Sequence, residues 1–305
     1  MRILLTGATG FIGRHLVCVL VARGHFVSCL VRLGSERRLR LPDRTRSERV
    51  SGDLTDPDSL GRKPLGCEAL VSLAGIRREI PADGQTFAAV HVDGLRDLLA
   101  SCLESGVGRV VHVSALQASP DAVNAYRRSK GEGEAVVRSF PIPWTILRPA
   151  LVYGPGSPTV AWMRRLTLGA PLLPVPVFGG ATRISPIWVD DLAAAVAACL
   201  ERPATVGETF DAVGPETLTV SDLVAAIARA RGVPHWHVGF SANAARSAAR
   251  FADRLPWGPE PPGTLDLLGE DHVADPQPLV AATGVALTSL ADGLRLTLRR
   301  PSRDG

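Results

Sequence analysis

The amino-acid sequence predicts an α/β protein with a doubly wound parallel sheet, followed by a smaller second domain. In the first half, apolar runs rich in Ile, Leu and Val alternate with segments of helical periodicity. This order is typical of a parallel sheet with helices on both faces. A glycine-rich segment separates the first apolar run from the first helix, and after residue 149 the alternation gives way to frequent proline and glycine. The chain is therefore expected to divide into residues 1–150 and 151–305.

The strands expected in the first domain are short and apolar. They lie at 2–5, 26–31, 69–73, 109–113 and 144–147, and the helices expected between them span 11–22, 86–104 and 122–138. The run RVVHV at 109–113 is apolar at nearly every position. Such a pattern indicates a strand that is covered on both faces.

The second domain is expected to be rich in loops, because prolines crowd residues 154–186. Some of its elements are expected to return to the first domain. Helices are expected near 159–168, at 189–200, from 219 to about 231, at 241–254 and at 288–299, with a strand at 208–213.

The composition is typical of a globular protein that binds neither nucleic acid nor an anionic membrane. Hydrophobic residues make up 46% of the chain and the net charge is +4, so neither nucleic acid nor an anionic membrane is expected as a partner. The longest apolar run, Leu192 to Leu200, is about half the length of a membrane span. Five cysteines without a C-x-x-C pair indicate reduced thiols, a cytoplasmic location and no metal site.

The segment TGATGFIG, from Thr6 to Gly13, carries the first functional signal. It follows the expected strand at 2–5 and leads into the expected helix at 11–22. Glycine lets the backbone turn tightly and lets a pyrophosphate approach the N-terminus of a helix. In this context Gly7, Gly10 and Gly13 predict a dinucleotide-binding loop, with a tight structural turn as the alternative.

Arg32 stands where the second strand ends, a position at which NAD sites usually carry an acidic residue for the ribose hydroxyls. Segment 32–49 holds seven arginines against three acidic residues. A 2′-phosphate would be stabilised by such a segment, which favours NADP over NAD. A solvated basic loop is the alternative interpretation.

Tyr126 and Lys130 form the second functional signal. The chain has only two tyrosines and two lysines, and one of each is separated by four residues. On a helix, residues i and i+4 share one face. A lysine ammonium beside a phenol favours the phenolate and lowers its pKa toward the range of a general acid. The pair predicts a proton donor for a carbonyl reduction, with an ordinary surface pair as the alternative.

These motifs resemble the extended branch of the short-chain dehydrogenase/reductase superfamily, an atypical group of NAD-dependent epimerase/dehydratase-like proteins. Within it, the chain is most similar to the group of the NAD(P)H-binding accessory subunit of respiratory complex I and its bacterial relatives. The matching segments are TGATGFIG (6–13), GDLTDPDSL (52–60), LAG (73–75), HVDGLRDLL (91–99), VHVSA (111–115), YRRSK (126–130), LRPALVYGPG (147–156) and PIWVDDLA (186–193).

The resemblance implies a Rossmann-type fold with a smaller C-terminal substrate domain, and it implies a role for each matching residue. Tyr126 would be the acid/base, Lys130 would bind the ribose and tune Tyr126, and Ser114 would polarise a substrate carbonyl. The pyrophosphate would lie on the glycine loop, and Asp53 and Leu54 would flank the adenine. Ala74 and Gly75 would line the path toward the nicotinamide ribose, and Pro149 would contact the nicotinamide side. The cofactor-binding set is Gly7, Thr9, Gly10, Phe11, Ile12, Gly13, Arg32, Asp53, Leu54, Ala74, Gly75, Lys130 and Pro149.

The sequence also departs from the family pattern. The usual Asn before V-x-G-T is His91, the Thr is Leu95, and Ala115 and Leu116 replace further hydroxyl residues after Ser114. No acidic pair of the sugar dehydratases lies between Ser114 and Tyr126. Arg183 lies about one residue from where nucleotide-sugar enzymes place an arginine on the substrate pyrophosphate, and a surface or domain-interface arginine is the favoured interpretation. Tyr153 is expected to have a packing or loop role.

Three functions follow from the resemblance. The first is an NADP-preferring oxidoreductase, with NAD possible, acting on a small-molecule carbonyl or alcohol. The second is a cofactor-binding structural or assembly protein without turnover, because the catalytic set is incomplete. The third is a nucleotide-sugar epimerase, which rests on fold analogy. A homo-oligomer or a protein complex is possible in each case, and the sequence does not name the substrate.

Overall fold

The computed structural model describes residues 1–61, 64–167, 175–233, 236–240 and 270–299. They form two compact units. The first comprises Met1–Pro149, Asp190–Ala212 and Gln277–Ala286, and the second comprises Ala150–Val189, Val213–Pro276 and Leu287–Gly305. Each unit has its own cluster of buried hydrophobic side chains.

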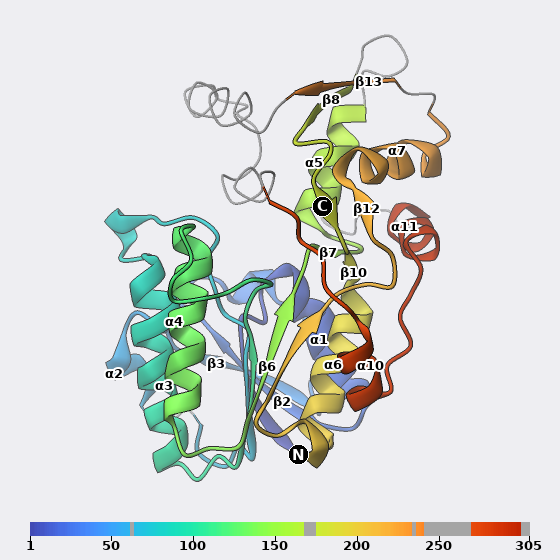
Figure 1. Cartoon of the computed structure of the whole chain (residues 1–305). Coiled ribbons are helices and arrows are strands. Elements are labelled where there is room, and N and C mark those ends of the chain that lie inside the picture. Colours follow the sequence, from blue (N-terminus) through green and yellow to red (C-terminus); the bar gives the residue numbers. More distant parts are fainter. Residues whose placement is uncertain (62–63, 168–174, 234–235, 241–269, 300–305) are drawn as a thin grey trace. The chain divides into compact units, whose positions relative to one another are not determined.

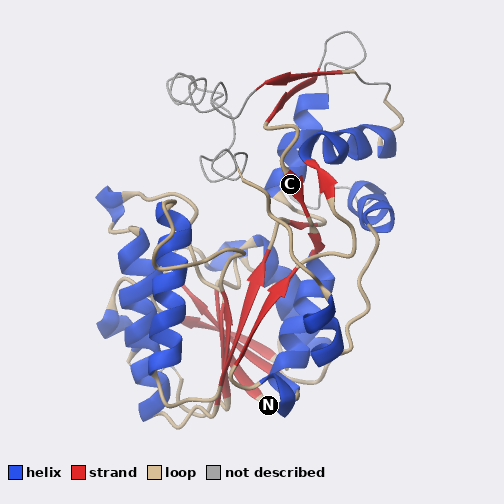
Figure 2. Cartoon of the chain, viewed as in Figure 1, coloured by secondary structure: helices blue, strands red, loops and turns tan. Residues whose placement is uncertain are grey.

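A seven-stranded parallel sheet forms the centre of the first unit, in the order β11-β6-β5-β4-β1-β2-β3 (Figures 1 and 2). Its strands are β1 (Arg2–Thr6), β2 (Phe26–Val31), β3 (Ser47–Ser51), β4 (Ala69–Ser72), β5 (Arg109–Val113), β6 (Trp144–Pro149) and β11 (Glu208–Ala212). The chain changes direction across the sheet between β1 and β4, the point at which doubly wound sheets bind ligands. The predicted Rossmann-type fold is confirmed.

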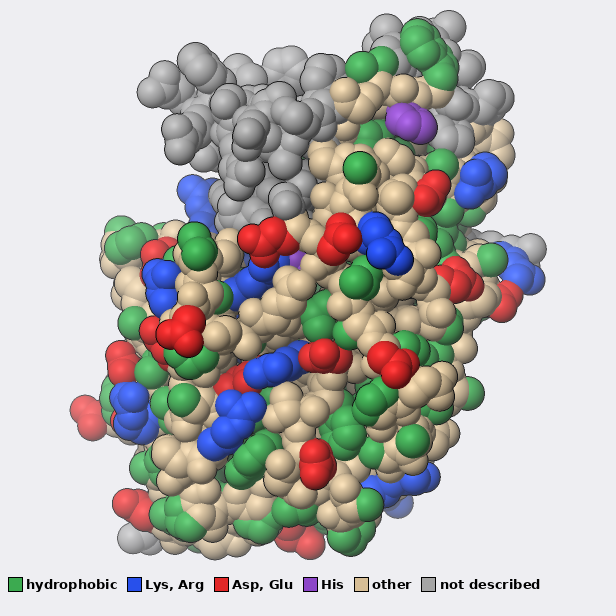
Figure 3. All heavy atoms as spheres, in the orientation of Figure 1, with side chains coloured by type: hydrophobic (Ala, Val, Ile, Leu, Met, Phe, Trp, Pro, Cys, Tyr) green, Lys and Arg blue, Asp and Glu red, His purple; other side chains and the backbone are tan. Residues whose placement is uncertain are grey.

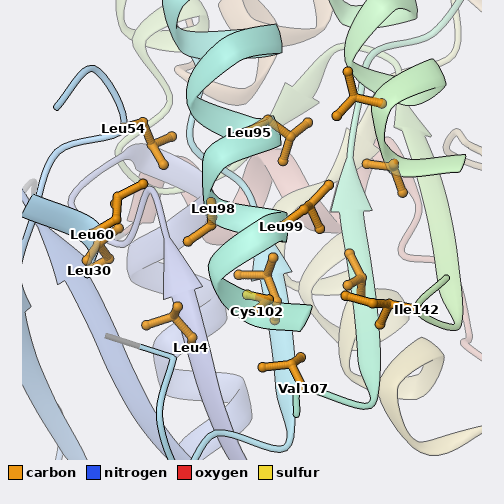
Figure 4. Close-up of a cluster of buried hydrophobic side chains, with 14 of the residues drawn as sticks. Leu4, Leu30, Leu54, Leu60, Leu95, Leu98, Leu99, Cys102, Val107 and Ile142 are labelled. Carbon is orange, nitrogen blue, oxygen red and sulfur yellow. The ribbon is translucent and has the colours of Figure 1, made fainter. Parts of the chain in front are cut away.

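Helices cover both faces of this sheet (Figure 1). On one face lie α1 (Phe11–Ala22), α6 (Val189–Glu201) and α10 (Gln277–Thr283). On the other lie α3 (Gly94–Glu104) and α4 (Ala125–Ser139), whose apolar side chains pack against the sheet. Figure 4 shows side chains of α3 facing Leu4 and Leu30 of the sheet. Burying each such leucine stabilises the fold by about 1.5–3 kcal/mol.

Three elements of the first unit differ in detail from the expectation. Strand β3 was not expected, because its sequence SERVS is mostly polar, yet it pairs in parallel with β2 at the edge of the sheet. The helix expected over 122–138 begins only at Ala125, because the Asn124 side chain accepts a hydrogen bond from the Arg127 N–H and caps it. The helix expected over 86–104 begins at Phe87 and contains a short π-helix, η3 (Ala89–Asp93), that continues into α3.

The second unit contains three described helices and several short strand pairs. The helices are α5 (Pro158–Leu166), α7 (Val220–Ala230) and α11 (Leu290–Arg299). The pairs are β7 (Val152–Tyr153) with β10 (Ile187–Trp188), β8 (Val175–Phe178) with β13 (His237–Phe240), and β9 (Arg183–Ile184) with β12 (Leu218–Thr219). A capping box of Thr219 and Asp222 starts α7. The helix expected at 241–254 lies outside the described residues.

The drawn surface and the cysteines do not point to a particular ligand. Acidic and basic side chains are interspersed on the face drawn in Figure 3. The five cysteines are free, and four of them are buried. Among the described residues, no group of three or more His, Cys, Asp or Glu side chains is arranged to hold a metal ion. No described helix is long and apolar enough to cross a membrane.

Candidate functional site

Three glycines at the end of β1 turn the chain into α1, and two of them are required by close contacts with neighbouring backbone atoms. Gly7 has a φ of +74°, and a Cβ at this position would lie 2.8 Å from the Ala74 nitrogen. A Cβ on Gly13 would collide with the Gly7 carbonyl oxygen. Gly10 differs, because its Cβ would meet only the Gly7 oxygen, at 3.2 Å. Packing therefore explains Gly7 and Gly13, whereas Gly10 is exposed and its Cβ would be crowded only by the Gly7 carbonyl oxygen.

The exposed Gly10 lies at the N-terminus of α1. Gly10 is the N-cap of this helix, no side chain caps it, and its first turn carries no acidic residue. The first N–H groups of a helix and its dipole favour an anion at such an end. The residues present thus fit a pyrophosphate, with Thr9, Phe11 and Ile12 partly exposed around it.

Thr6 connects the glycine loop to the segment that follows β4. Its buried hydroxyl oxygen accepts hydrogen bonds from the backbone N–H groups of Leu73 (3.1 Å) and Ala74 (3.0 Å). The segment continues through Gly75, which is exposed, to Ile76, whose N–H donates to Nε2 of His91 at 3.0 Å. Ala74 and Gly75 therefore lie between the glycine loop and the η3 helix.

Tyr126 and Lys130 lie in the first two turns of α4, as expected. The Tyr126 ring is partly exposed and meets two other rings edge-on, Phe87 at 5.9 Å and His91 at 5.8 Å between centroids. Among the described residues, the Tyr126 hydroxyl makes no hydrogen bond. Lys130 is buried, and its ammonium donates to the Val113 carbonyl oxygen at 2.8 Å.

The charges around this pair differ from the expectation. Although one part of the Tyr126 side chain reaches solvent, the protein atoms around the rest of it desolvate the phenol and raise its pKa above the usual value, and the charge that opposes this shift is Arg77, not Lys130. Burial also lowers the pKa of Lys130 to about 8, with Glu134 acting against the shift. The expected lowering of the phenol's pKa by Lys130 is thus not found in this structure, in which the ammonium is directed at Val113.

Ser114 is buried at the end of β5 on the side of α4. Its hydroxyl lies near Glu134 and helps to lower the pKa of that carboxyl, whose main partner is Arg148. The Arg148 guanidinium donates to both Glu134 oxygens, at 2.8 and 2.6 Å. Among the described residues, the Ser114 hydroxyl has no hydrogen bond of normal geometry, to Tyr126 or to any other group. Ser114 is therefore enclosed beside an ion pair.

Arg32 and Asp53 flank the same edge of the sheet. Arg32 directly follows β2, whose Leu30 pairs with Thr6 of β1, and its side chain is exposed. The Asp53 carboxylate accepts hydrogen bonds from the N–H and the hydroxyl of Thr55, at 3.0 and 2.9 Å. Leu54 is buried in the core beneath α3. Arg32 is thus available to a ligand, while Leu54 also packs the fold.

Pro149 ends β6, and its carbonyl oxygen accepts a hydrogen bond from the Leu116 N–H at 2.9 Å. It therefore belongs to the same sheet edge. Arg183 and Tyr153 lie in the second unit. The Arg183 backbone N–H donates to Asp271, and the buried Tyr153 packs against Trp188, with ring centroids 5.5 Å apart.

Sequence reasoning missed three residues that border Tyr126. Phe87 stacks on His91 with centroids 5.5 Å apart, and Ser129 bonds both to His91 and to the Tyr126 backbone. Arg77 contributes the nearby positive charge. The helical spacing of Phe87 to His91 and of Tyr126 to Ser129 was a usable signal. The contact between the two helices was not readable from one sequence.

Comparison with known proteins adds a family and several relatives. A family model described as the NAD dependent epimerase/dehydratase family matches residues 3–212. A ceramide reductase from Caulobacter vibrioides is 34% identical over 203 residues, which are 65% of this chain and 61% of that protein. NADH dehydrogenase (ubiquinone) 1 alpha subcomplex subunit 9, mitochondrial, from Dictyostelium discoideum is 28% identical over 216 residues, 70% of this chain and 59% of that protein.

The chain thus spans less than two thirds of the length of either curated relative. A solved structure shares the fold over nearly the whole chain. It is a UDP-glucuronic acid 4-epimerase from Bacillus cereus in complex with UDP-glucuronic acid and NAD. Its TM-score is 0.73 at 22% identity, and the match covers 97% of this chain and 98% of that chain.

Proposed function

Since this chain belongs to the NAD dependent epimerase/dehydratase family, we propose that it is an NADP-preferring oxidoreductase that transfers a hydride to or from a carbonyl or alcohol carbon. The substrate is a small molecule. Tyr126 is the acid/base, Lys130 binds the ribose hydroxyls, and the glycine loop holds the pyrophosphate.

One observation carries the proposal, an unbroken series of contacts from the glycine loop to Tyr126. Gly7 adjoins the Ala74 nitrogen, and Thr6 accepts a hydrogen bond from that same N–H at 3.0 Å. Two residues later, Ile76 donates to His91, whose ring meets Tyr126. A dinucleotide that has its pyrophosphate at Gly10 would pass along Ala74 and Gly75 toward the phenol.

The proposed chemistry divides between cofactor and protein. When bound, the nicotinamide supplies or accepts the hydride. Tyr126 donates its phenolic proton to the carbonyl oxygen, or accepts it from the alcohol in the reverse direction, since it is partly exposed and its hydroxyl is free for a substrate. Arg77 supplies the positive charge that favours the phenolate that remains, while the Lys130 ammonium, held at the end of β5, is left to bind the ribose hydroxyls.

NADP preference rests on Arg32 and its neighbours. The exposed guanidinium at the end of β2 can donate to a 2′-phosphate, whereas an NAD site would place a carboxylate there. Glu36 begins the short helix η1 (Glu36–Arg38), which also carries Arg37 and Arg38. The segment supports an anionic ligand, and the later arginines remain a solvated basic surface in this proposal.

A second candidate function is a non-catalytic NADP(H)-binding structural or assembly protein. The enclosed Ser114 favours it, because the hydroxyl that would orient a substrate carbonyl lies beside Glu134. The complex I subunit among the relatives also supports a place in a protein complex or a homo-oligomer. A nucleotide-sugar epimerase is the third candidate and rests on the shared fold alone. The free thiols favour a cytoplasmic location.

Calorimetric titration with NADPH and NADH, followed by incubation with a panel of aldehydes and ketones, tests the proposal. We expect tighter binding of NADPH, and oxidation of NADPH in equal amount to the alcohol formed. Tight binding without product from any carbonyl would favour the structural candidate. Failure to bind either nucleotide would contradict both candidates.

A further inference from the structure

His91 forms hydrogen bonds at both ring nitrogens, and their directions can be assigned. The Ile76 backbone N–H lies 3.0 Å from Nε2 and can only donate, so Nε2 is an unprotonated acceptor. The proton of the neutral ring then lies on Nδ1, which donates to the Ser129 hydroxyl oxygen at 2.8 Å. The Ser129 hydroxyl in turn donates to the Tyr126 carbonyl oxygen at 2.8 Å. The three bonds form one directed chain from the segment after β4 to the residue that carries the phenol.

The ring of His91 is also fixed by packing. Its side chain is almost fully buried, stacked on Phe87 and edge-on to Tyr126. A Cβ at Gly75 would lie 3.1 Å from Nε2, and a Cβ at Gly133 of α4 would lie 2.6 Å from the His91 carbonyl oxygen. The backbone at His91 is the π-helix η3, a form that is frequent at functional sites. Little freedom remains for the ring to turn.

We propose that His91 is a positioning residue, which clamps the segment 73–76 to α4 through a single neutral tautomer and thereby fixes the Tyr126 ring relative to Ala74 and Gly75. The proposal rests on the proposed function of Tyr126 and adds a residue to it. In this proposal His91 does not act on substrate or cofactor directly. Its effect passes through Ile76 on one side and through Ser129 on the other.

The neutral state of the ring is a condition for this clamp. Protonation would place a hydrogen on Nε2, which would then face the Ile76 N–H and lose its hydrogen bond. Burial and the positive charge of Lys130 lower the pKa of His91 to about 3. The clamp therefore persists over the whole pH range in which such a protein works. A phenylalanine would keep the stacking and lose both bonds, while a glutamine would keep an acceptor for Ile76.

The two tyrosines of the chain make a spectroscopic test possible without any substrate. Protein labelled with 3-fluorotyrosine gives fluorine signals from Tyr126 and Tyr153 alone, and the Tyr153→Phe variant assigns them. The signal of Tyr126, its pKa and the NADPH affinity would be compared in wild type, His91→Phe, His91→Gln and Ser129→Ala. Leu99→Ala serves as the matched control, since Leu99 is fully buried on α3, the continuation of η3, and does not border the phenol.

We expect His91→Phe to narrow the Tyr126 signal, because the ring gains freedom when both hydrogen bonds of the clamp are lost. NADPH affinity should fall about five- to fifty-fold, the scale of one or two lost hydrogen bonds. Ser129→Ala should reproduce the change at Tyr126 with a smaller loss of affinity, and His91→Gln should restore affinity in part. Leu99→Ala should lower the melting temperature and leave the Tyr126 signal unchanged.

Two outcomes would overturn the proposal. One is a Tyr126 signal in His91→Phe and Ser129→Ala that matches wild type. The other is an equal change of that signal in Leu99→Ala at an equal loss of melting temperature, which would mean a general loosening of the core. If His91→Phe fails to fold, His91→Gln and Ser129→Ala decide the matter. Because the fluorine signal requires no turnover, this result is independent of whether the proposed oxidoreductase activity is found.

Discussion

The two tyrosines of the chain occupy opposite environments in its two units. In the second unit, the Tyr153 side chain is 1% exposed, its hydroxyl donates to the Ser289 carbonyl oxygen, and Gly293 packs against its ring. In the first unit, Tyr126 is partly exposed between two aromatic rings, and among the described residues its hydroxyl has no hydrogen-bond partner. The comparison teaches that packing and hydrogen bonding within the fold account for Tyr153, whereas the surroundings of Tyr126 leave its hydroxyl free for a ligand.

The glycines at the end of β1 show the same difference between a residue required by packing and one exposed to a ligand, and substituting them should have the largest effect on folding and on binding. Gly13→Val should prevent folding, because its Cβ would collide with the Gly7 carbonyl oxygen. Gly10→Val should fold and lose nucleotide binding, because the side chain would occupy the space next to the helix N-terminus. Circular dichroism and calorimetric titration with NADPH would separate the two. Unchanged NADPH affinity in a folded Gly10→Val protein would remove the glycine loop from the site.

Lys130→Met should separate function from stability. We expect turnover and NADPH affinity to fall together, by about tenfold or more in each, because the variant lacks the ammonium at the end of β5 that the proposal assigns to the ribose hydroxyls. Stability should change little or rise, since burial lowers the pKa of Lys130 to about 8 and the buried charge is costly at neutral pH. Thermal unfolding at pH 7 measures this. A large loss of melting temperature would assign Lys130 a structural role like that of Tyr153.

Arg32→Ala tests the preference for NADPH over NADH at the adenosine end of the cofactor. The variant should lose about 1–3 kcal/mol of NADPH binding and leave NADH binding nearly unchanged, because only NADPH has a 2′-phosphate. Calorimetry with both nucleotides gives the difference, and Arg37→Ala provides a matched exposed arginine from the same segment. Equal affinities of wild type for NADPH and NADH would refute the cofactor preference.

The pH dependence of stability should reflect the neutral histidine of the site. His91 has a pKa of about 3 when folded and about 6.5 when unfolded, so the unfolded chain binds more protons between these values. Its contribution is fully present above about pH 6.5 and is lost as the pH falls toward 3. Between pH 7 and 5 we expect wild type to lose at most about 2 kcal/mol through this group. In urea unfolding, the free energy of unfolding of His91→Gln should fall less between pH 7 and 5 than that of wild type. An identical fall in both proteins would contradict the contribution assigned to His91.

The sequence was sufficient for the fold of the first unit and for the family. Apolar runs and the glycine loop are local patterns, and they predicted the strands from β1 to β6 and helix α1 apart from the polar edge strand β3. The family model confirms the family that the motifs indicated. By contrast, the contact of Ser129 with His91 joins helices 38 residues apart in the chain. The direction of the Lys130 ammonium and the enclosure of Ser114 also depend on side-chain packing between distant segments. Such packing cannot be predicted from a single sequence.

Single-turnover reduction by bound NADPH, measured in Tyr126→Phe and Tyr153→Phe side by side, tests the central claim most directly. Both variants lose one hydroxyl, and both should bind NADPH as wild type does. With a carbonyl that wild type reduces, the account predicts that Tyr126→Phe oxidises NADPH at least about a hundredfold more slowly, the scale of a lost general acid. Tyr153→Phe should keep the wild-type rate and lose only about 0.5–1.5 kcal/mol of stability with its hydrogen bond to Ser289. Equal rates in the two variants would contradict the assignment of Tyr126 as the acid/base.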